Sequence, residues 1–262
     1  MPATGLDLRY VRLADMDGDG KVDYVWIHPV TGLIRVRLNR YPGAWFKTGT
    51  DDGIIANGRG PSDAIFLADM NGDGKADYLV VNADTGAVNV YWTYGPDAGW
   101  SHGWNCVDGD QVASGEPHAN WKTLRLADMN GDGRADYLTV GVRESPAMWI
   151  NRGTLGQDVK WLKQGGITGG GAVTNLGQLV LADIDGDGRA DYLIFDDGAD
   201  ISGYLNIMTQ WSGTALFQSQ GGAKSIASDS VRFADIDGDG VSLPNSSVFF
   251  TPFGAYADVT WI

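Results

Sequence analysis

A nine-residue loop with regularly spaced aspartates occurs five times in this 262-residue chain, and this repetition constrains the fold more than any other feature. The copies begin 52 to 59 residues apart, at Asp15, Asp69, Asp128, Asp183 and Asp235. A sequence that repeats at such an interval is typical of proteins built from similar units that pack on one another. We therefore expect an array of about five related units.

The sequence around each loop also repeats, and it predicts four short β-strands per unit. In the second unit, an apolar run at 77–81 is followed by an Asp- and Gly-containing turn at 83–86 and an alternating run at 88–92, which is typical of a hairpin. Another apolar run precedes each loop, and a weaker fourth run ends in glycine-rich sequence. Four strands in about 50 residues are typical of a propeller blade.

We therefore predict an all-β fold, with a single β-propeller domain over residues 1–262 and about five four-stranded blades. In the last repeat, Leu243 stands where the other repeats have aspartate, and Pro244 would disturb a central strand. The last blade is therefore expected to be incomplete or to be closed by the N-terminus, whose residues 3–5 resemble the end of another repeat. The expected repeats span roughly 6–58, 59–115, 116–171, 172–223 and 224–262.

Oxygen-bearing side chains at positions 1, 3, 5 and 9 of the loop predict a calcium site. Ca²⁺ prefers six to eight oxygen ligands, and a glycine at position 6 allows the chain to turn sharply around the ion. Position 7 would contribute its backbone carbonyl, so its side chain is free to be Lys or Arg. We expect four strong sites and a weaker fifth, formed by Asp15, Asp17, Asp19, Lys21 and Asp23; Asp69, Asn71, Asp73, Lys75 and Asp77; Asp128, Asn130, Asp132, Arg134 and Asp136; Asp183, Asp185, Asp187, Arg189 and Asp191; and Asp235, Asp237 and Asp239.

Two other interpretations of the loop fit the sequence less well. An EF-hand needs a glutamate at position 12 and a helix on each side, whereas position 12 here is Trp26, Val80, Thr139, Ile194 or Ser246. An ordinary turn would also favour Asp and Gly. Fivefold repetition of the same ligand spacing favours the metal site, because several carboxylates in one loop repel one another without a cation.

The net charge of −14 limits the classes of partner. Nucleic acid and anionic membrane surfaces favour basic proteins, so neither is expected as a partner. No apolar stretch is long enough to insert into a bilayer. Residues 1–10 lack the basic start and apolar run of a secretory signal peptide, which leaves two interpretations open, a cytoplasmic chain or a mature piece of a secreted protein.

The repeats resemble the VCBS / FG-GAP family, whose calcium-loop blades are related to those of integrin α-subunit propellers. Residues 67–78, with the sequence LADMNGDGKADY, match the family's loop residue by residue, and the repeats are most similar to those of fungal extracellular proteins. The resemblance implies structural calcium ions, an extracellular location, and ligands bound on loops or between blades. The Phe-Gly and Gly-Ala-Pro signatures of integrins are absent, so integrin-type partner binding is not implied.

The sequence contains no nucleophile elbow, zinc-protease motif or P-loop. We therefore expect a non-catalytic, calcium-stabilised binding module whose ligand is a carbohydrate, lectin-like or accessory to a secreted hydrolase. Two alternatives stay open: a lyase or cyclase that uses a central or inter-blade pocket for a small natural product or polysaccharide, and an adhesion domain with a protein partner. Aromatic faces beside polar groups suit sugar rings, so the predicted ligand contacts are Trp100, His102 and Trp121.

Overall fold

The computed structural model has an all-β architecture in the residues it describes, which are 8–42, 54–96, 109–117, 119–141, 146–154, 159–164, 179–195, 201–207, 211–217, 235, 238 and 240. These residues contain sixteen β-strands and two short 3₁₀ helices, η1 (Leu8–Tyr10) and η2 (Ser62–Ala64). No helix among them is long and apolar enough to span a membrane.

The strands form four antiparallel sheets, and each sheet consists of four strands that are consecutive in the sequence. We call these sheets blades 1 to 4. Their strands are β1 (Val11–Ala14), β2 (Asp23–Ile27), β3 (Ile34–Arg37) and β4 (Ile54–Ala56); β5 (Ile65–Ala68), β6 (Asp77–Val81), β7 (Val88–Tyr91) and β8 (Asp110–Ala113); β9 (Leu124–Ala127), β10 (Asp136–Thr139), β11 (Ala147–Asn151) and β12 (Trp161–Gln164); and β13 (Leu179–Ala182), β14 (Asp191–Phe195), β15 (Ile201–Asn206) and β16 (Trp211–Phe217).

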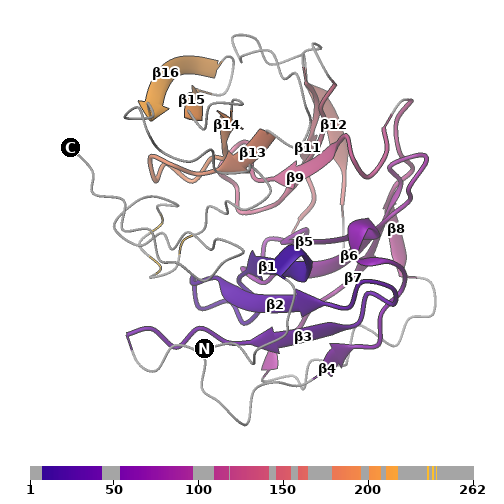
Figure 1. Ribbon diagram of the computed structural model, residues 1–262. Coiled ribbons are helices and arrows are strands. Elements are labelled where there is room, and N and C mark those ends of the chain that lie inside the picture. Colours follow the sequence, from indigo (N-terminus) through magenta and orange to yellow (C-terminus); the bar gives the residue numbers. More distant parts are fainter. Residues whose placement is uncertain are drawn as a thin grey trace.

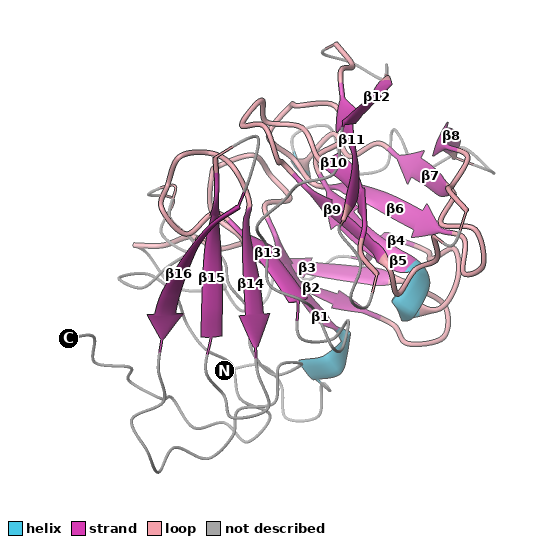
Figure 2. Ribbon diagram, turned by 90° about the horizontal axis from the view of Figure 1, so that it is seen from above, coloured by secondary structure: helices cyan, strands magenta, loops and turns pink. Residues whose placement is uncertain are grey.

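The blades succeed one another in chain order around the molecule (Figures 1 and 2). The first strands of neighbouring blades, β1 with β5 and β9 with β13, contact each other and lie on the inner side of the arrangement (Figure 2). The predicted β-propeller with four-stranded blades is therefore confirmed.

The described residues form four sheets, so they account for four of the predicted number of about five blades. The fifth repeat, 224–262, lies outside the described residues except for Asp235, Gly238 and Gly240, and so do residues 1–7, which were expected to close the last blade.

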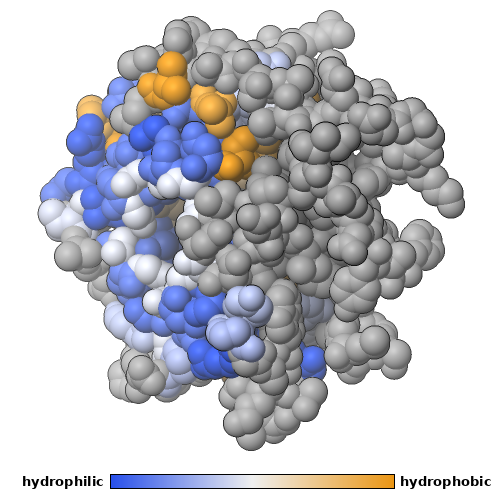
Figure 3. Space-filling model, turned by 90° about the vertical axis from the view of Figure 1, so that its left-hand side faces the viewer, coloured by the Kyte–Doolittle hydropathy of each residue, from blue (hydrophilic) through white to orange (hydrophobic). Residues whose placement is uncertain are grey.

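The hydrophobic core lies between the faces of adjacent blades. One cluster joins blades 1 and 2, a second joins blades 2 and 3, and a third joins blades 3 and 4. Central strands are therefore buried on both faces, which explains why β6 reads as an almost continuous apolar run. Where the surface in Figure 3 is coloured, hydrophilic residues cover most of the face, with a small group of hydrophobic residues among them.

Candidate metal centres in the blade loops

The aspartate loops connect the first strand of each blade to its second strand. We call them loops 1 to 4, spanning 15–23, 69–77, 128–136 and 183–191, and use loop 5 for the copy that begins at Asp235. The position-1 carboxylate of each loop accepts hydrogen bonds from the backbone N–H groups at positions 4 and 6. In loop 1, Asp15 accepts from Gly18 at 2.7 Å and from Gly20 at 2.8 Å, and the other four loops repeat both bonds at 2.7 to 2.8 Å.

Glycine is required at positions 4 and 6 because the backbone is left-handed there. The φ angles of these ten glycines lie between +76° and +87°, a region that side chains with a Cβ rarely adopt. Each loop therefore curls around its position-1 carboxylate in the same way, and loop 5 shares this geometry.

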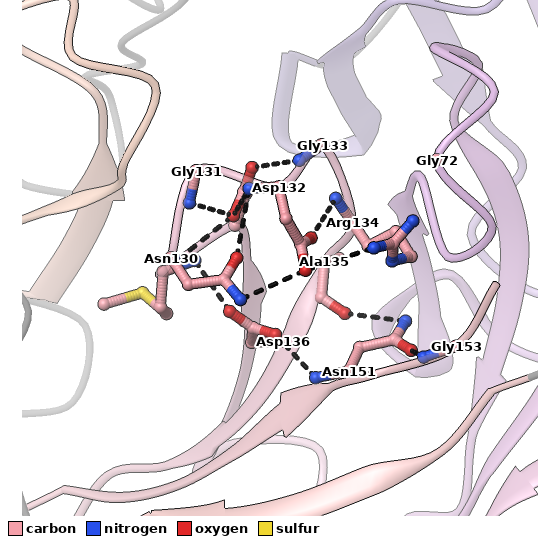
Figure 4. A network of polar contacts seen from close by, with 12 residues as sticks. Gly72, Asn130, Gly131, Asp132, Gly133, Arg134, Ala135, Asp136, Asn151 and Gly153 are labelled. Carbon is pink, nitrogen blue, oxygen red and sulfur yellow. Dashed lines mark hydrogen bonds and ion pairs between the residues drawn. The ribbon is translucent and has the colours of Figure 1, made fainter. Parts of the chain in front are cut away.

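Loops 1 and 4 bring three carboxylates together. Oxygens of Asp15, Asp17 and Asp19 lie within 4.8 Å of one another, and the same holds for the equivalent trio in loop 4, Asp183, Asp185 and Asp187. In loops 2 and 3, position 3 is an asparagine. Its side-chain oxygen accepts the N–H of the position-5 aspartate, at 2.9 Å in loop 2 and 3.0 Å in loop 3; Figure 4 shows this network in loop 3.

One carboxylate oxygen in loop 1 lies in surroundings that suit a cation ligand. Asp17 Oδ1 is buried and has no hydrogen-bond partner, and the Asp17 side chain is only 7% exposed. The other oxygen, Oδ2, accepts a hydrogen bond from Arg40 Nη1 at 2.7 Å. A buried polar atom without a partner is rare in folded proteins, and a hard oxygen close to two further carboxylates suits Ca²⁺. The residues of loop 1 therefore fit the predicted ion.

The position-9 aspartates are completely buried and connect the loop to the third strand of the blade. In blade 1, Asp23 accepts the N–H of Met16 at 2.9 Å and the N–H of Asn39 at 2.7 Å. The equivalent pairs of bonds occur in the other three blades, at 2.7 to 3.1 Å. Their role as metal ligands stays a prediction, whereas the structure shows that they join the loop to the end of the third strand.

Burial raises the pKa of two carboxyls, those at positions 1 and 9, in each of loops 1 to 4. It raises the pKa of Asp23 and Asp136 to about 7 and that of Asp191 to about 6, although their two backbone N–H bonds act in the opposite direction. Burial likewise raises the pKa of the position-1 aspartates of loops 1 to 4, and neighbouring carboxylates add to the effect in loops 1, 2 and 4. A cation bound among these groups would favour their ionised forms.

The basic side chains at position 7 lie beside the position-5 carboxylates. Lys21 Nζ is 2.8 Å from Asp19 Oδ2, and Arg134 pairs with Asp132 at 3.2 Å. The same pair in loop 2 is wider, at 4.0 Å, and in loop 4 Arg189 contacts Asp187. These side chains are therefore counter-ions, as expected if only the backbone carbonyl of position 7 is a ligand.

Successive loops contact each other directly, which the sequence did not predict. The position-8 N–H of one loop donates to the position-1 carbonyl of the preceding loop, at 2.7 Å from Ala76 to Asp15, from Ala135 to Asp69 and from Ala190 to Asp128. Val22 of loop 1 donates in the same way to Asp235 of loop 5, at 3.0 Å. Loop 5 therefore contacts loop 1 through the same hydrogen bond by which loop 1 contacts loop 2.

Asparagines at the ends of the third strands form a second link between blades. Asn151 Nδ2 donates to the carbonyl of Met70 at 2.9 Å, and Asn206 Nδ2 donates to that of Met129 at 2.8 Å. Sequence reasoning missed these residues, although a repeated asparagine 15 or 16 positions after the last loop aspartate was a usable signal.

The structure describes one of the three predicted ligand-contact residues. Trp121 is partly buried against the core between blades 2 and 3, and Lys122 Nζ lies 5.2 Å from the centre of its ring. Trp121 therefore packs against the core, and its contact with a ligand stays a prediction. Trp100 and His102 lie outside the described residues, as do Asp237 and Asp239 of loop 5.

Comparison with known proteins gives one family match. The family described as FG-GAP-like repeat matches residues 15–80, 69–139 and 128–194, which together make up more than half of the chain. No curated protein matches the chain.

Several solved structures are similar. An Agrocybe aegerita lectin that specifically recognises non-reducing terminal N-acetylglucosamine is 17% identical over 88% of this chain and 72% of that chain, with a TM-score of 0.48. The Photorhabdus luminescens Tc holotoxin pore is 22% identical over 92% of this chain and 11% of that chain, with a TM-score of 0.48. A TcdB2–TccC3 structure is 17% identical over 88% of this chain and 13% of that chain, with a TM-score of 0.50. This similarity shows the fold alone.

Proposed function

Because the chain belongs to the family of FG-GAP-like repeat proteins, we propose that it is a calcium-stabilised β-propeller that serves as a non-catalytic binding module. The observation that carries the calcium assignment is loop 1, where the unpartnered buried oxygen of Asp17 lies beside the carboxylates of Asp15 and Asp19. The ligand set consists of oxygens alone, which favours Ca²⁺ over metals that prefer imidazole or thiolate.

In this proposal the ions stabilise the blades and do not take part in a reaction. Each loop joins two strands of its own blade and contacts the loop of the next blade. A cation would offset the repulsion among the loop carboxylates, which are drawn together by the fold. It would therefore bind the folded chain much more tightly than the unfolded chain and raise its stability.

The test compares thermal unfolding in excess chelator with unfolding in calcium, alongside a calorimetric calcium titration. Asp183→Asn removes one carboxylate from the ligand set of loop 4, and Asp84→Asn is the matched control, because Asp84 is exposed in a hairpin turn outside the loops. We expect calcium to raise the unfolding temperature, and Asp183→Asn to lower the number of bound ions while Asp84→Asn does not. An identical unfolding temperature in chelator and in calcium, with no heat of binding, would refute the assignment.

We also propose that the ring closes at five blades. Support comes from loop 5, which docks on loop 1 through Val22 and Asp235 with the geometry seen between the other neighbouring loops. A Cβ atom on Gly238 would lie 3.1 Å from Lys21 Cγ, just as one on Gly72 would lie 3.1 Å from Arg134 Cγ. The fifth repeat would therefore occupy the position between blades 4 and 1.

The proposed ligand of the module is a carbohydrate, and its support is the aromatic segment 94–104. Tyr94, the first residue of this segment, is 40% exposed. A glycan array with the wild type, Trp100→Ala and the control Tyr41→Ala would test the proposal; Tyr41 is as exposed as Tyr94 and lies in the segment after β3. We expect binding that Trp100→Ala alone abolishes; no glycan bound by the wild type would contradict it.

A further inference from the structure

Loops 1 and 4 carry the same four carboxylates, at positions 1, 3, 5 and 9, but they differ in what contacts position 3. In loop 1, the guanidinium of Arg40 donates to Asp17 Oδ2 at 2.7 Å. The Arg40 side chain is 44% exposed, whereas Asp17 is 7% exposed. A solvated cation thus covers one oxygen of a buried carboxylate, while the other oxygen stays free within the loop.

The residue equivalent to Arg40 can be identified in every blade from the hydrogen bond that the position-9 aspartate accepts. Arg40 directly follows Asn39, whose N–H donates to Asp23. The residues that donate in the same way in the other blades are Thr93, Asn151 and Asn206, so the counterparts of Arg40 are Tyr94, Arg152 and Ile207.

None of these counterparts is a cation beside a position-3 carboxylate. Ile207, beside loop 4, is 45% exposed and carries no charge. Arg152 lies beside loop 3, where position 3 is the neutral Asn130. Within the part of the chain that the structure describes, a guanidinium bonded to the position-3 carboxylate occurs in loop 1 alone. Loop 4 therefore has the same four carboxylates as loop 1, and in the described residues it lacks a guanidinium on the position-3 carboxylate.

We propose that Arg40 sets the calcium affinity of loop 1 by acting as a built-in counter-ion that lowers it relative to loop 4. The proposal rests on the calcium-binding function proposed above. Arg40 offsets one negative charge of the ligand set, because its Nη1 is 2.7 Å from Asp17 Oδ2, and it would repel a cation bound by the same carboxylate. At a solvated protein surface, repulsion between a monovalent and a divalent cation about 6 Å apart corresponds to about a tenfold loss of affinity.

The weaker site would lie at the closing contact of the loops. Loop 1 contains Val22, the donor to Asp235 of loop 5. Falling calcium would therefore empty the loop at this contact before it empties loop 4. In the absence of the ion, Arg40 would partly replace it by neutralising Asp17.

The experiment is a calcium titration of the full ¹⁵N-labelled chain, followed by NMR at two backbone amides. Gly20 and Gly188 report on loops 1 and 4, because their N–H groups donate to the position-1 carboxylates, both at 2.8 Å. Reciprocal variants, Arg40→Ile and Ile207→Arg, exchange the residues beside the two loops. Arg40→Gln is a second neutral variant, and Arg152→Ile is the matched control, because it removes the same charge beside loop 3.

In the wild type, we expect the Gly20 signal to reach its midpoint at about tenfold more calcium than the Gly188 signal. Arg40→Ile and Arg40→Gln should remove this difference, and Ile207→Arg should move the Gly188 midpoint upward by a similar factor. Arg152→Ile should move neither. High salt should shrink the difference, since Arg40 is exposed to solvent.

The two proposals fail in distinguishable ways. If calcium moves both signals but the Gly20 midpoint is unchanged or higher in both Arg40 variants, Arg40 does not lower the affinity and the inference is wrong. If calcium moves neither signal in the wild type, the calcium-binding function itself is wrong.

Discussion

The side chain of Asn151 in blade 3 donates a hydrogen bond to the backbone carbonyl of Met70 in blade 2, at 2.9 Å. Asn206 and Met129 make the same bond between blades 4 and 3. Thr93 occupies this position in blade 2, and its hydroxyl is buried without a hydrogen-bond partner. The contact between blades 1 and 2 therefore lacks a bond that the next two contacts have.

Replacing Thr93 with asparagine should stabilise the protein. The new amide would donate to the carbonyl of Met16, the equivalent of Met70, and it would remove an unsatisfied hydroxyl. We expect a gain of about 1 kcal/mol in the free energy of unfolding. The reverse change, Asn151→Thr, should lose about 1–2 kcal/mol. Urea denaturation of both variants in calcium measures these values, and a Thr93→Asn variant less stable than the wild type would contradict the expectation.

Substitution of two glycines in loop 3 should separate backbone strain from packing between loops. Gly131 and Gly133 have φ angles of +76° and +83°, so alanine is strained at both, by about 1–2 kcal/mol. A Cβ on Gly131 would also lie 3.3 Å from Arg189 Cγ of loop 4, whereas a Cβ on Gly133 would meet nothing within 4 Å. We expect Gly131→Ala to be the more destabilising variant in thermal unfolding; equal losses would indicate that the loops do not pack tightly.

The stability of the calcium-free protein should fall as the pH rises from 5 to 8. The pKa of Asp23 and Asp136 is about 7 in the folded chain and about 3.8 in the unfolded chain. Their neutral forms therefore favour the folded state, and this contribution is lost as the pH passes through 7. Urea denaturation in chelator at several pH values measures the trend. With saturating calcium, which favours the ionised carboxylates, the trend should be absent or reversed; a chelated protein that gains stability over this range would contradict the assignment.

The amide of Val22 should exchange slowly with solvent if loop 5 docks on loop 1. Its N–H donates to Asp235 at 3.0 Å, as that of Ala76 donates to Asp15 at 2.7 Å. Hydrogen exchange measured by NMR should show both amides protected in the full chain. Gly238→Val, which would place a branched side chain against Lys21, should accelerate exchange at Val22 and leave Ala76 protected. Fast exchange of Val22 in the wild type would show that this contact does not persist in solution.

The repeat period, the four strands of each blade and the turn of each loop could all be predicted from the sequence. Each depends on residues close together in the chain: alternating apolar residues specify strands, and glycines allow a left-handed backbone. The bond of Gly20 to Asp15 spans only five residues, so the spacing of the motif was enough to place it.

The tertiary structure alone decided how the units contact one another. Arg40 and Asp17 are 23 residues apart, and Asn206 and Met129 are 77 apart, so no local pattern relates them. Which side chains meet depends on the packing of one blade against the next, and packing follows shape and burial rather than sequence periodicity. For this reason the sequence indicated five similar loops, whereas the fold made loop 1 different from loop 4 and brought loop 5 against loop 1.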